Sequence, residues 1–252
     1  MSLFGNLKTE GLEKTEDRLG GFSQPNTDSY DAQIKVMYAV NAANSGAKGI
    51  AVVADIGGQE YRETIWITNK QGENWFPNKQ DPTKRIPLPG FTTINDLCLI
   101  GTGKELADQT TEEKMVKIYD YDAKREVPKS VHVLTDLTDA KVTLGLVKTL
   151  VNKTQKQGDE YVPVADTREE VSIDKVFDTG TKLTVVEAQT AAANNTTATA
   201  VFHPAWVEKN RGVTRDKRTI KDGQAGSSAK PGGAPQASSG GAPRQSLFGA
   251  KN

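Results

Sequence analysis

Aromatic rings set among basic side chains, between residues 62 and 85, are the part of this sequence best suited to binding chemistry. Residues 61–68 alternate as a strand does, so Arg62 and Trp66 share an outer face if Ile65 enters the core. An exposed ring stacks on nucleic-acid bases of any sequence, because every base has a π face, while nearby cations neutralise phosphates. The candidate binding residues are Arg62, Trp66, Lys70, Trp75, Phe76, Lys79, Lys84 and Arg85.

The loop at residues 70–79 has two interpretations. Trp75 and Phe76 stand among Pro, Asn and Lys residues, which is typical of a binding loop rather than of a core. In the other interpretation, both rings fold back and cover the end of the domain. Four more side chains surround a later predicted hairpin, where they either line the same groove or are simply solvated: Lys148, Lys153, Lys156 and Tyr161.

Enzymatic and cofactor-binding motifs are incomplete. Residues 101–104, Gly-Thr-Gly-Lys, resemble the end of a phosphate-binding loop, but Glu105 replaces the Ser or Thr that binds magnesium and Cys98 replaces the first glycine. A helix stop is the favoured interpretation. Cys98 lies in an apolar run, which indicates a packed thiol rather than a nucleophile. The two histidines, His132 and His203, lack metal-binding spacing. We therefore expect no catalytic residue, no metal and no cofactor.

Two carboxylate pairs are the remaining option for metal chemistry. Asp120 with Asp122, and Asp136 with Asp139, are able in principle to hold magnesium, but neither pair has a third ligand at a motif spacing. Solvated turn residues are the favoured interpretation. A magnesium-dependent nuclease or annealing enzyme that uses Asp120 and Asp122 stays a minor alternative.

The first half of the sequence predicts a strand meander. Alternation over residues 30–40 predicts a strand, and its apolar face holds Ile34, Val36, Tyr38 and Val40. Two further runs, 49–56 and 61–68, flank Gly57-Gly58, which predicts a hairpin with a tight turn.

Helical signals follow. From Gly90 the pattern predicts a helix capped by Thr92 or Thr93 and ended by the glycines at 101 and 103. A capping-box signature at residues 110–113 predicts a second short helix, which carries Met115, Val116 and Ile118. Strand-like patterns then return at residues 131–134, 141–147, 171–177 and 183–186.

This order of elements predicts a mainly β fold, a five-stranded Greek-key barrel of the OB type with a helical insertion after the third strand. We expect an N-terminal arm at residues 1–29, the OB-type domain at residues 30–208 and a disordered basic tail at residues 209–252. Within the domain, residues 188–201 are expected to form a mobile loop, and residues 202–206 to close the fold.

Three runs carry a family resemblance: residues 61–74, 87–97 and 119–128 are similar to bacteriophage single-stranded DNA-binding proteins, above all to those of podoviruses that encode small RNA polymerases. The similarity spans roughly residues 1 to 220. The resemblance implies an OB-fold that binds single-stranded DNA without sequence preference in replication and recombination. In some members of that group the protein also recruits or activates an RNA polymerase.

The expected tail differs from the acidic tails of many such proteins. The whole chain has 32 basic and 32 acidic side chains, yet residues 209–252 hold nine of the basic and two of the acidic ones, so their net charge is +7 and that of the rest is −7. The tetrapeptide Ser-Leu-Phe-Gly occurs at residues 2–5 and again at residues 246–249. A hydrophobic tip on a cationic arm favours DNA phosphates or an acidic protein surface as its target. The candidate docking residues are Leu247, Phe248 and Lys251.

The leading hypothesis is a non-enzymatic single-stranded DNA-binding protein in the cytoplasm of an infected host cell. The alternative is a transcription cofactor that holds single-stranded DNA and recruits a phage or host RNA polymerase through its body or tail. Replication proteins and self-association are further partner options, whereas a membrane is not expected, since no apolar run approaches the length of a bilayer span.

Overall fold

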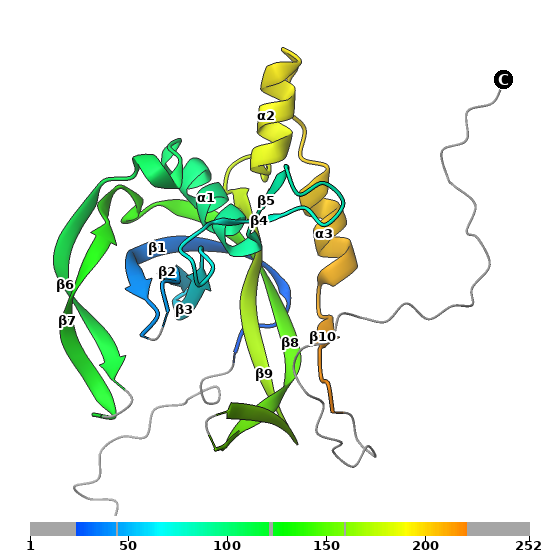
Figure 1. The fold of residues 1–252 in the computed structure, drawn as a ribbon. Coiled ribbons are helices and arrows are strands. Elements are labelled where there is room, and N and C mark those ends of the chain that lie inside the picture. The colour runs from blue at the N-terminus through cyan, green and yellow to red at the C-terminus, as the bar shows by residue number, and fades with distance from the viewer. Residues whose placement is uncertain (1–23, 44, 121–122, 159, 221–252) are drawn as a thin grey trace, which may run out of the picture. The chain divides into compact units, whose positions relative to one another are not determined.

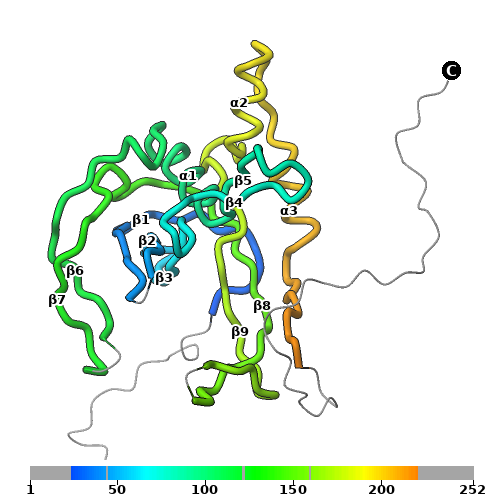
Figure 2. Tube along the Cα trace, in the orientation of Figure 1, coloured from blue at the N-terminus to red at the C-terminus, as the bar shows by residue number. Residues whose placement is uncertain are grey.

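A computed structural model describes residues 24–43, 45–120, 123–158 and 160–220, which fall into two compact units. Strands predominate (Figures 1 and 2). In chain order the elements are β1 (Asp28–Asn41), β2 (Lys48–Ile56), β3 (Gln59–Trp66), β4 (Trp75–Pro77), β5 (Arg85–Pro87), α1 (Pro89–Thr102), the 3-10 turn η1 (Leu106–Asp108), β6 (Thr111–Asp120), β7 (Arg125–Leu134), the 3-10 turn η2 (Thr135–Leu137), β8 (Lys141–Gln157), β9 (Glu160–Asp178), α2 (Val185–Ala193), α3 (Phe202–Asn210) and β10 (Thr214–Asp216).

The larger unit is organised around β1, which pairs on both of its edges. One edge forms an antiparallel ladder with β2, and β2 continues into β3 through the two-residue turn Gly57-Gly58. Both glycines have positive φ, as a tight hairpin turn requires, and the predicted hairpin is confirmed. The other edge of β1 pairs first with β8 and then, at Tyr38, with Val133 of β7.

A bulge in β1 moves its apolar residues between two faces. The register against β2 shifts between Ile34 and Val36, so one residue more stands on β1 than on its partner. Ile34 and Met37 are consequently both fully buried in the main core, whereas Val36 and Tyr38 face the other side of the sheet. The predicted uninterrupted alternation is therefore wrong at this point.

The main core lies under α1. Its fully buried side chains come from the inner faces of the strands and from one side of the helix: Ile34, Met37, Val52, Ile94, Leu97, Cys98, Val142, Leu144 and Leu146. The predicted helix after the third strand is confirmed, but it begins earlier than expected. Leu88 is its N-cap and Pro89 its first residue, because proline presets the backbone angle of a first helical turn. Thr92 and Thr93 lie inside the helix rather than at its cap.

The sheets do not close into a barrel. In a closed barrel, β3 and β9 would lie next to each other. Here side chains of β3 connect the two strands: the Ile173 backbone N–H donates to Glu63 at 2.8 Å, and the Tyr61 hydroxyl lies 3.3 Å from the Val171 carbonyl oxygen. A closed five-stranded barrel is thus not what the described residues form, although the mainly β class and the helical insertion are as predicted.

The second predicted helix is wrong, because residues 111–120 form β6. This strand pairs with β7 over its whole length, and Figure 1 shows the two-stranded ribbon arching beside β1, β2 and β3. Val116 and Ile118 alternate with polar residues and pack towards β1 and β2, which outweighs the local capping signal. The outer cluster formed in this way consists of Tyr38, Ala51, Val53 and Val133, with Val36, Val40, Val116, Ile118 and Val131 against them.

The segment after β9 also differs from expectation. Residues 185–193 form α2 instead of a strand followed by a loop, because Thr184 and Glu187 build a capping box at its start. The predicted closure by residues 202–206 is confirmed: Trp206 of α3 is buried against Phe177 and Val147. Gly145 makes this contact possible, since a Cβ there would stand 3.1 Å from the Trp206 ring.

The boundary expected between residues 208 and 209 falls inside α3. Ordered contacts continue beyond it, because β10 pairs in parallel with β8 and Arg215 forms an ion pair with Asp174 at 2.9 Å. The proposed docking residues Leu247, Phe248 and Lys251 and most of the N-terminal arm lie outside the described residues.

The smaller unit contains residues 152–167 and, within the described range, residues 218–220. Asn152 joins the two segments: its side-chain oxygen accepts from the N–H groups of Thr219 and Ile220 at 2.8 and 2.9 Å, and its amide donates to the Ile220 carbonyl. None of the helices in the described residues is both long and apolar enough to cross a membrane.

Candidate nucleic-acid interface

The outer face of β3 carries two of the predicted binding residues, Arg62 and Trp66, which lie four positions and about 13 Å apart along the strand. Tyr61 and Ile65 point into the main core, and period-two geometry therefore turns Arg62, Thr64 and Trp66 outward. The Trp66 side chain is 46% exposed even though it belongs to a sheet with a well-packed core. This part of the prediction is confirmed as a placement of side chains.

Trp66 stands over a glycine on the neighbouring strand. Gly49 of β2 pairs with Trp66, and a Cβ at Gly49 would come within 3.1 Å of Trp66 Cε3. The missing side chain lets the indole approach the β2 backbone on one side. At the same end of the strand, Gly90 at the start of α1 approaches the Trp66 carbonyl so closely that a Cβ would clash with it. One glycine thus lies against the exposed ring, and the other lies against the backbone of the same residue.

The outer cluster continues this face towards the β6–β7 ribbon. Because β7 pairs with β1, the sheet β6-β7-β1-β2-β3 brings the ribbon to the face that carries Arg62 and Trp66, and Tyr38 and Val53 on this face are buried against the aliphatic residues of β6 and β7. Sequence reasoning missed this ribbon as a part of the site. The signal was present in residues 116–119, where Val, Lys, Ile and Tyr alternate with a period of two.

Arg62 is held by two carboxylates. Its Nε donates to Glu60 at 2.6 Å, and its Nη2 lies 3.3 Å from a carboxylate oxygen of Glu126 on β7. Partial burial lowers the pKa of Arg62, but the hydrogen bond and the charges of Glu60 and Glu126 outweigh burial, so the pKa lies above its ordinary value. A phosphate that binds Arg62 must therefore compete with these carboxylates.

The β4–β5 hairpin forms a second aromatic and basic group. The Arg85 guanidinium lies 4.3 Å from the centroid of the Trp75 ring, in cation–π geometry, because Pro77 pairs with Arg85 and Trp75 with Pro87. Trp75 is half-buried and Phe76 is 39% exposed. Neither ring is buried in the core. The exposure of Phe76 does not support the interpretation in which both rings fold back and cover the end of the domain.

The remaining predicted lysines differ in their surroundings. Lys84 forms an ion pair with Asp81 at 3.5 Å, while Lys79 is exposed and has no ion pair within the described part of the chain. Lys70 does not belong to the β3 face, because the strand ends at Trp66. It lies in a turn, where its backbone carbonyl accepts a hydrogen bond from the Gly46 N–H. Within the described residues, no hydrogen bond or ion pair joins the side chains of the β3 group to those of the β4–β5 hairpin.

The later lysines fall into two places. Lys148 sits at a shallow, open depression with Gln24, where it contacts Glu169 at 3.2 Å and Asn26 at 2.9 Å. Its charge is thus already compensated. Lys153, Lys156 and Tyr161 belong to the smaller unit, and Lys153 faces Asp166 there at 3.7 Å.

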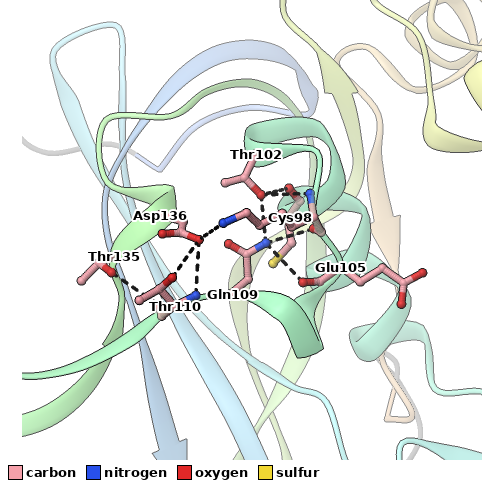
Figure 3. A network of polar contacts seen from close by, with 8 residues as sticks. Cys98, Thr102, Glu105, Gln109, Thr110, Thr135 and Asp136 are labelled. Atoms are coloured by element: carbon pink, nitrogen blue, oxygen red, sulfur yellow. Dashed lines mark hydrogen bonds and ion pairs between the residues drawn. The ribbon is translucent and has the colours of Figure 1, made fainter.

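The segment that resembles a phosphate-binding loop is a helix end (Figure 3). Gly103 is the C-cap of α1 with φ of 75°, and Lys104 binds Asp136 at 2.8 Å. The hydrogen bond from Lys104, followed by that from the Thr110 N–H, lowers the pKa of Asp136. Gln109 completes the network by donating to the Thr102 hydroxyl and to two carbonyl oxygens. These contacts fasten α1 to the base of the β6–β7 ribbon, and the predicted helix stop is confirmed.

Nucleophilic and metal chemistry find little support in the described residues. Cys98 is fully buried, and burial raises the pKa of its thiol to about 12, which makes the thiolate scarce at neutral pH. Within residues 24–43, 45–120, 123–158 and 160–220, no group of three or more His, Cys, Asp or Glu side chains is arranged to hold a metal ion. Asp120 is paired with Lys129 at 3.0 Å, and Asp122 lies outside the described residues.

Comparison with known proteins does not assign this chain to a class. No protein-family model matches the chain, and no curated protein matches it either. The resemblance to phage single-stranded DNA-binding proteins therefore stays a prediction.

Proposed function

We propose that this protein binds single-stranded DNA without sequence preference and performs no catalysis. The observation that carries the proposal is Trp66, an exposed indole held over Gly49 on the outer face of β3, with Arg62 on the same face of the strand. Base stacking on such a ring contributes about 1–3 kcal/mol per base and tolerates every base. The Trp75–Arg85 pair and the exposed Phe76 supply further stacking surfaces.

The topology supports an OB-like scaffold as part of the proposal. In an OB-fold, the first strand pairs with both the second and the fourth, and the outer face of strands two and three holds the ligand. Here β1 pairs with β2 and β8, a helix follows the third strand, and one of the candidate rings, Trp66, lies on the outer face of β3. The β6–β7 ribbon flanks this face and would form one wall for a bound strand.

Charge and apolar surface favour a single strand over a duplex. The exposed apolar group on this face is the Trp66 ring, which suits unpaired bases, whereas the residues of the outer cluster are packed against one another and the cations are few and partly paired. Binding to duplex DNA depends mainly on a dense set of phosphate contacts. We therefore expect stacking to dominate affinity, with a salt dependence of about 0.7 in logarithmic slope for each phosphate contacted.

The test measures the anisotropy of a labelled oligo-dT with the full chain and with three variants: Trp66→Ala, Trp75→Ala and the double variant. Each single change should weaken binding by about 1–3 kcal/mol. Phe202→Ala is the matched control, because Phe202 is also an exposed aromatic residue but lies on α3. Unchanged oligo-dT affinity in the double variant would overturn the proposal, as would equal affinity for duplex and single strand.

A further inference from the structure

The free edge of β6 is the feature with the clearest use beyond DNA binding. Within the described residues, β6 pairs with β7 alone, so along residues 111–118 its other edge leaves backbone N–H and C=O groups without a ladder partner. Such an edge is a template for another strand. The described part of the chain places no helix or strand over it.

The side chains on the exposed face of β6 are self-complementary. Val116 and Ile118 point towards the outer cluster, so Glu113, Met115 and Lys117 share the opposite face. Met115 is 65% exposed, which is unusual for a large apolar side chain at the centre of a strand. Glu113 therefore precedes the exposed Met115 by two positions, and Lys117 follows it by two positions.

Geometry limits how two β6 edges can meet. Backbone groups of successive residues point to alternate edges, so in an antiparallel pair of identical strands only residues of equal parity can stand opposite each other. The register centred on Met115 places Glu113 of each copy opposite Lys117 of the other copy. The next register in one direction sets Lys114 against itself, and the next in the other direction sets Glu112 against Asp120.

We propose that β6 forms an antiparallel pair with β6 of a second copy of this chain, on a two-fold axis at Met115. Two cross-strand ion pairs, each between Glu113 and Lys117, then flank a central Met115–Met115 contact. Lys117 is available for this role, since it forms no ion pair within the described residues, and Glu113 uses only one carboxylate oxygen on Ser130. A two-fold pair of edges is closed and leaves no further β6 edge exposed.

Charge reversal tests the proposal without DNA, by sedimentation equilibrium and light scattering of the full 27.2 kDa chain. The wild type should be dimeric at micromolar concentration. Lys117→Glu places carboxylates opposite each other at both contacts and should weaken dimerisation on the order of tenfold. The double variant Glu113→Lys with Lys117→Glu should restore it. Lys141→Glu, an exposed lysine at the start of β8, is the matched control and should have no effect.

Cross-linking supplies a second measurement that does not depend on charge. In an antiparallel pair, opposing Cα atoms lie about 4.5–5.5 Å apart, which falls within the range that a disulfide accepts. Oxidation of the Met115→Cys variant should therefore give a covalent dimer. Lys117→Cys should not, because the two copies of residue 117 would lie more than about 10 Å apart. Cys98 leaves a clean background, since it is buried.

Three results would overturn the proposal: a monomeric wild type, dimerisation that is equally strong in Lys117→Glu, or a double reversal that fails to restore the dimer. Each is independent of oligo-dT affinity, so failure here leaves the proposed function standing, and the reverse also holds.

Discussion

The backbone N–H of Ile173 in β9 donates a hydrogen bond to Glu63 Oε2 in β3, with 2.8 Å between the two atoms. The Tyr61 hydroxyl donates to the same oxygen, also at 2.8 Å. One carboxylate thus receives two donors and connects strands that share no backbone ladder in the described residues. The titratable side chain of Glu63 consequently connects β3 and β9 at the seam where a barrel would close.

The pH dependence of folding should report on this seam. Burial raises the pKa of Glu63, and the two donors only partly offset burial. Because the native state then binds a proton more tightly than the unfolded state, the contribution of Glu63 to the free energy of unfolding is greatest below the unfolded-state pKa and declines as pH rises through the folded-state pKa. We expect Glu63→Gln to lack this decline when urea unfolding is measured between about pH 4 and pH 7.

An exposed carboxylate elsewhere in the fold gives the control for this prediction. Glu105→Gln removes an exposed acid and should leave the pH profile of the wild type unchanged. If the profiles of Glu63→Gln and the wild type run parallel over the whole range, Glu63 does not carry the proposed linkage.

The true end of the folded chain can be located by truncation. A chain that ends at Ile220 keeps β10 and the Arg215–Asp174 ion pair, whereas a chain that ends at Glu208 loses both and also the acceptor that Val213 offers to Thr27. We expect the shorter chain to lose about 2–4 kcal/mol of stability, since a partly buried carboxylate loses its partner and several hydrogen bonds disappear. Equal melting temperatures for the two chains would show that β10 contributes nothing.

Releasing Arg62 from one of its two carboxylates should strengthen binding of single-stranded DNA. Glu126→Gln removes the more distant of the two ion pairs, 3.3 Å away, and the negative charge next to the proposed path of the strand. One extra phosphate contact would raise affinity on the order of two- to fivefold at low salt and steepen the salt slope by about 0.7. Glu112→Gln, on the same ribbon but paired with Lys114, serves as the control in an anisotropy titration. A salt slope that stays the same in Glu126→Gln would contradict a phosphate contact at Arg62.

The single cysteine should be chemically silent in the native protein. Burial raises the pKa of Cys98 to about 12 and removes it from solvent, so iodoacetamide should alkylate it slowly at pH 8 and rapidly after unfolding in urea. Mass spectrometry of the intact chain measures the modified fraction. Fast alkylation without denaturant would mean that α1 opens readily from the main core.

Several features could be predicted from the sequence because local rules decide them. Gly57-Gly58 has few conformational alternatives to a tight turn, and period-two geometry was enough to place Trp66 outside once Ile65 was assigned to the core. The same holds for Cys98, whose apolar neighbours predicted burial. In each case the signal lies within a few residues of the feature.

Other features depend on distant partners and were not predicted. Residues 110–113 have a capping-box sequence, yet β6 forms because β7 and the outer cluster offer its aliphatic residues a place to pack. Residues 183–186 have strand propensity, yet Thr184 and Glu187 form a capping box there, and the distant N–H groups of Val201 and Phe202 donate to the other oxygen of Glu187. The Glu63 seam could not be predicted, because nothing near Glu63 in the sequence indicates that the Ile173 N–H will face it.

The bulge in β1 consists of one extra residue, Lys35, between Ile34 and Val36, so the number of residues in this strand matters as well as their types. Ile34 stands opposite Ala54 and Val36 opposite Val53, so deleting Lys35 would leave a regular ladder in which Met37 still faces the main core and Tyr38 the outer cluster. Deleting Val36 instead would let the bulge close with Lys35 opposite Val53, which would place a lysine in the outer cluster. In a scan of deletions along the strand, the least damaging position should therefore be Lys35.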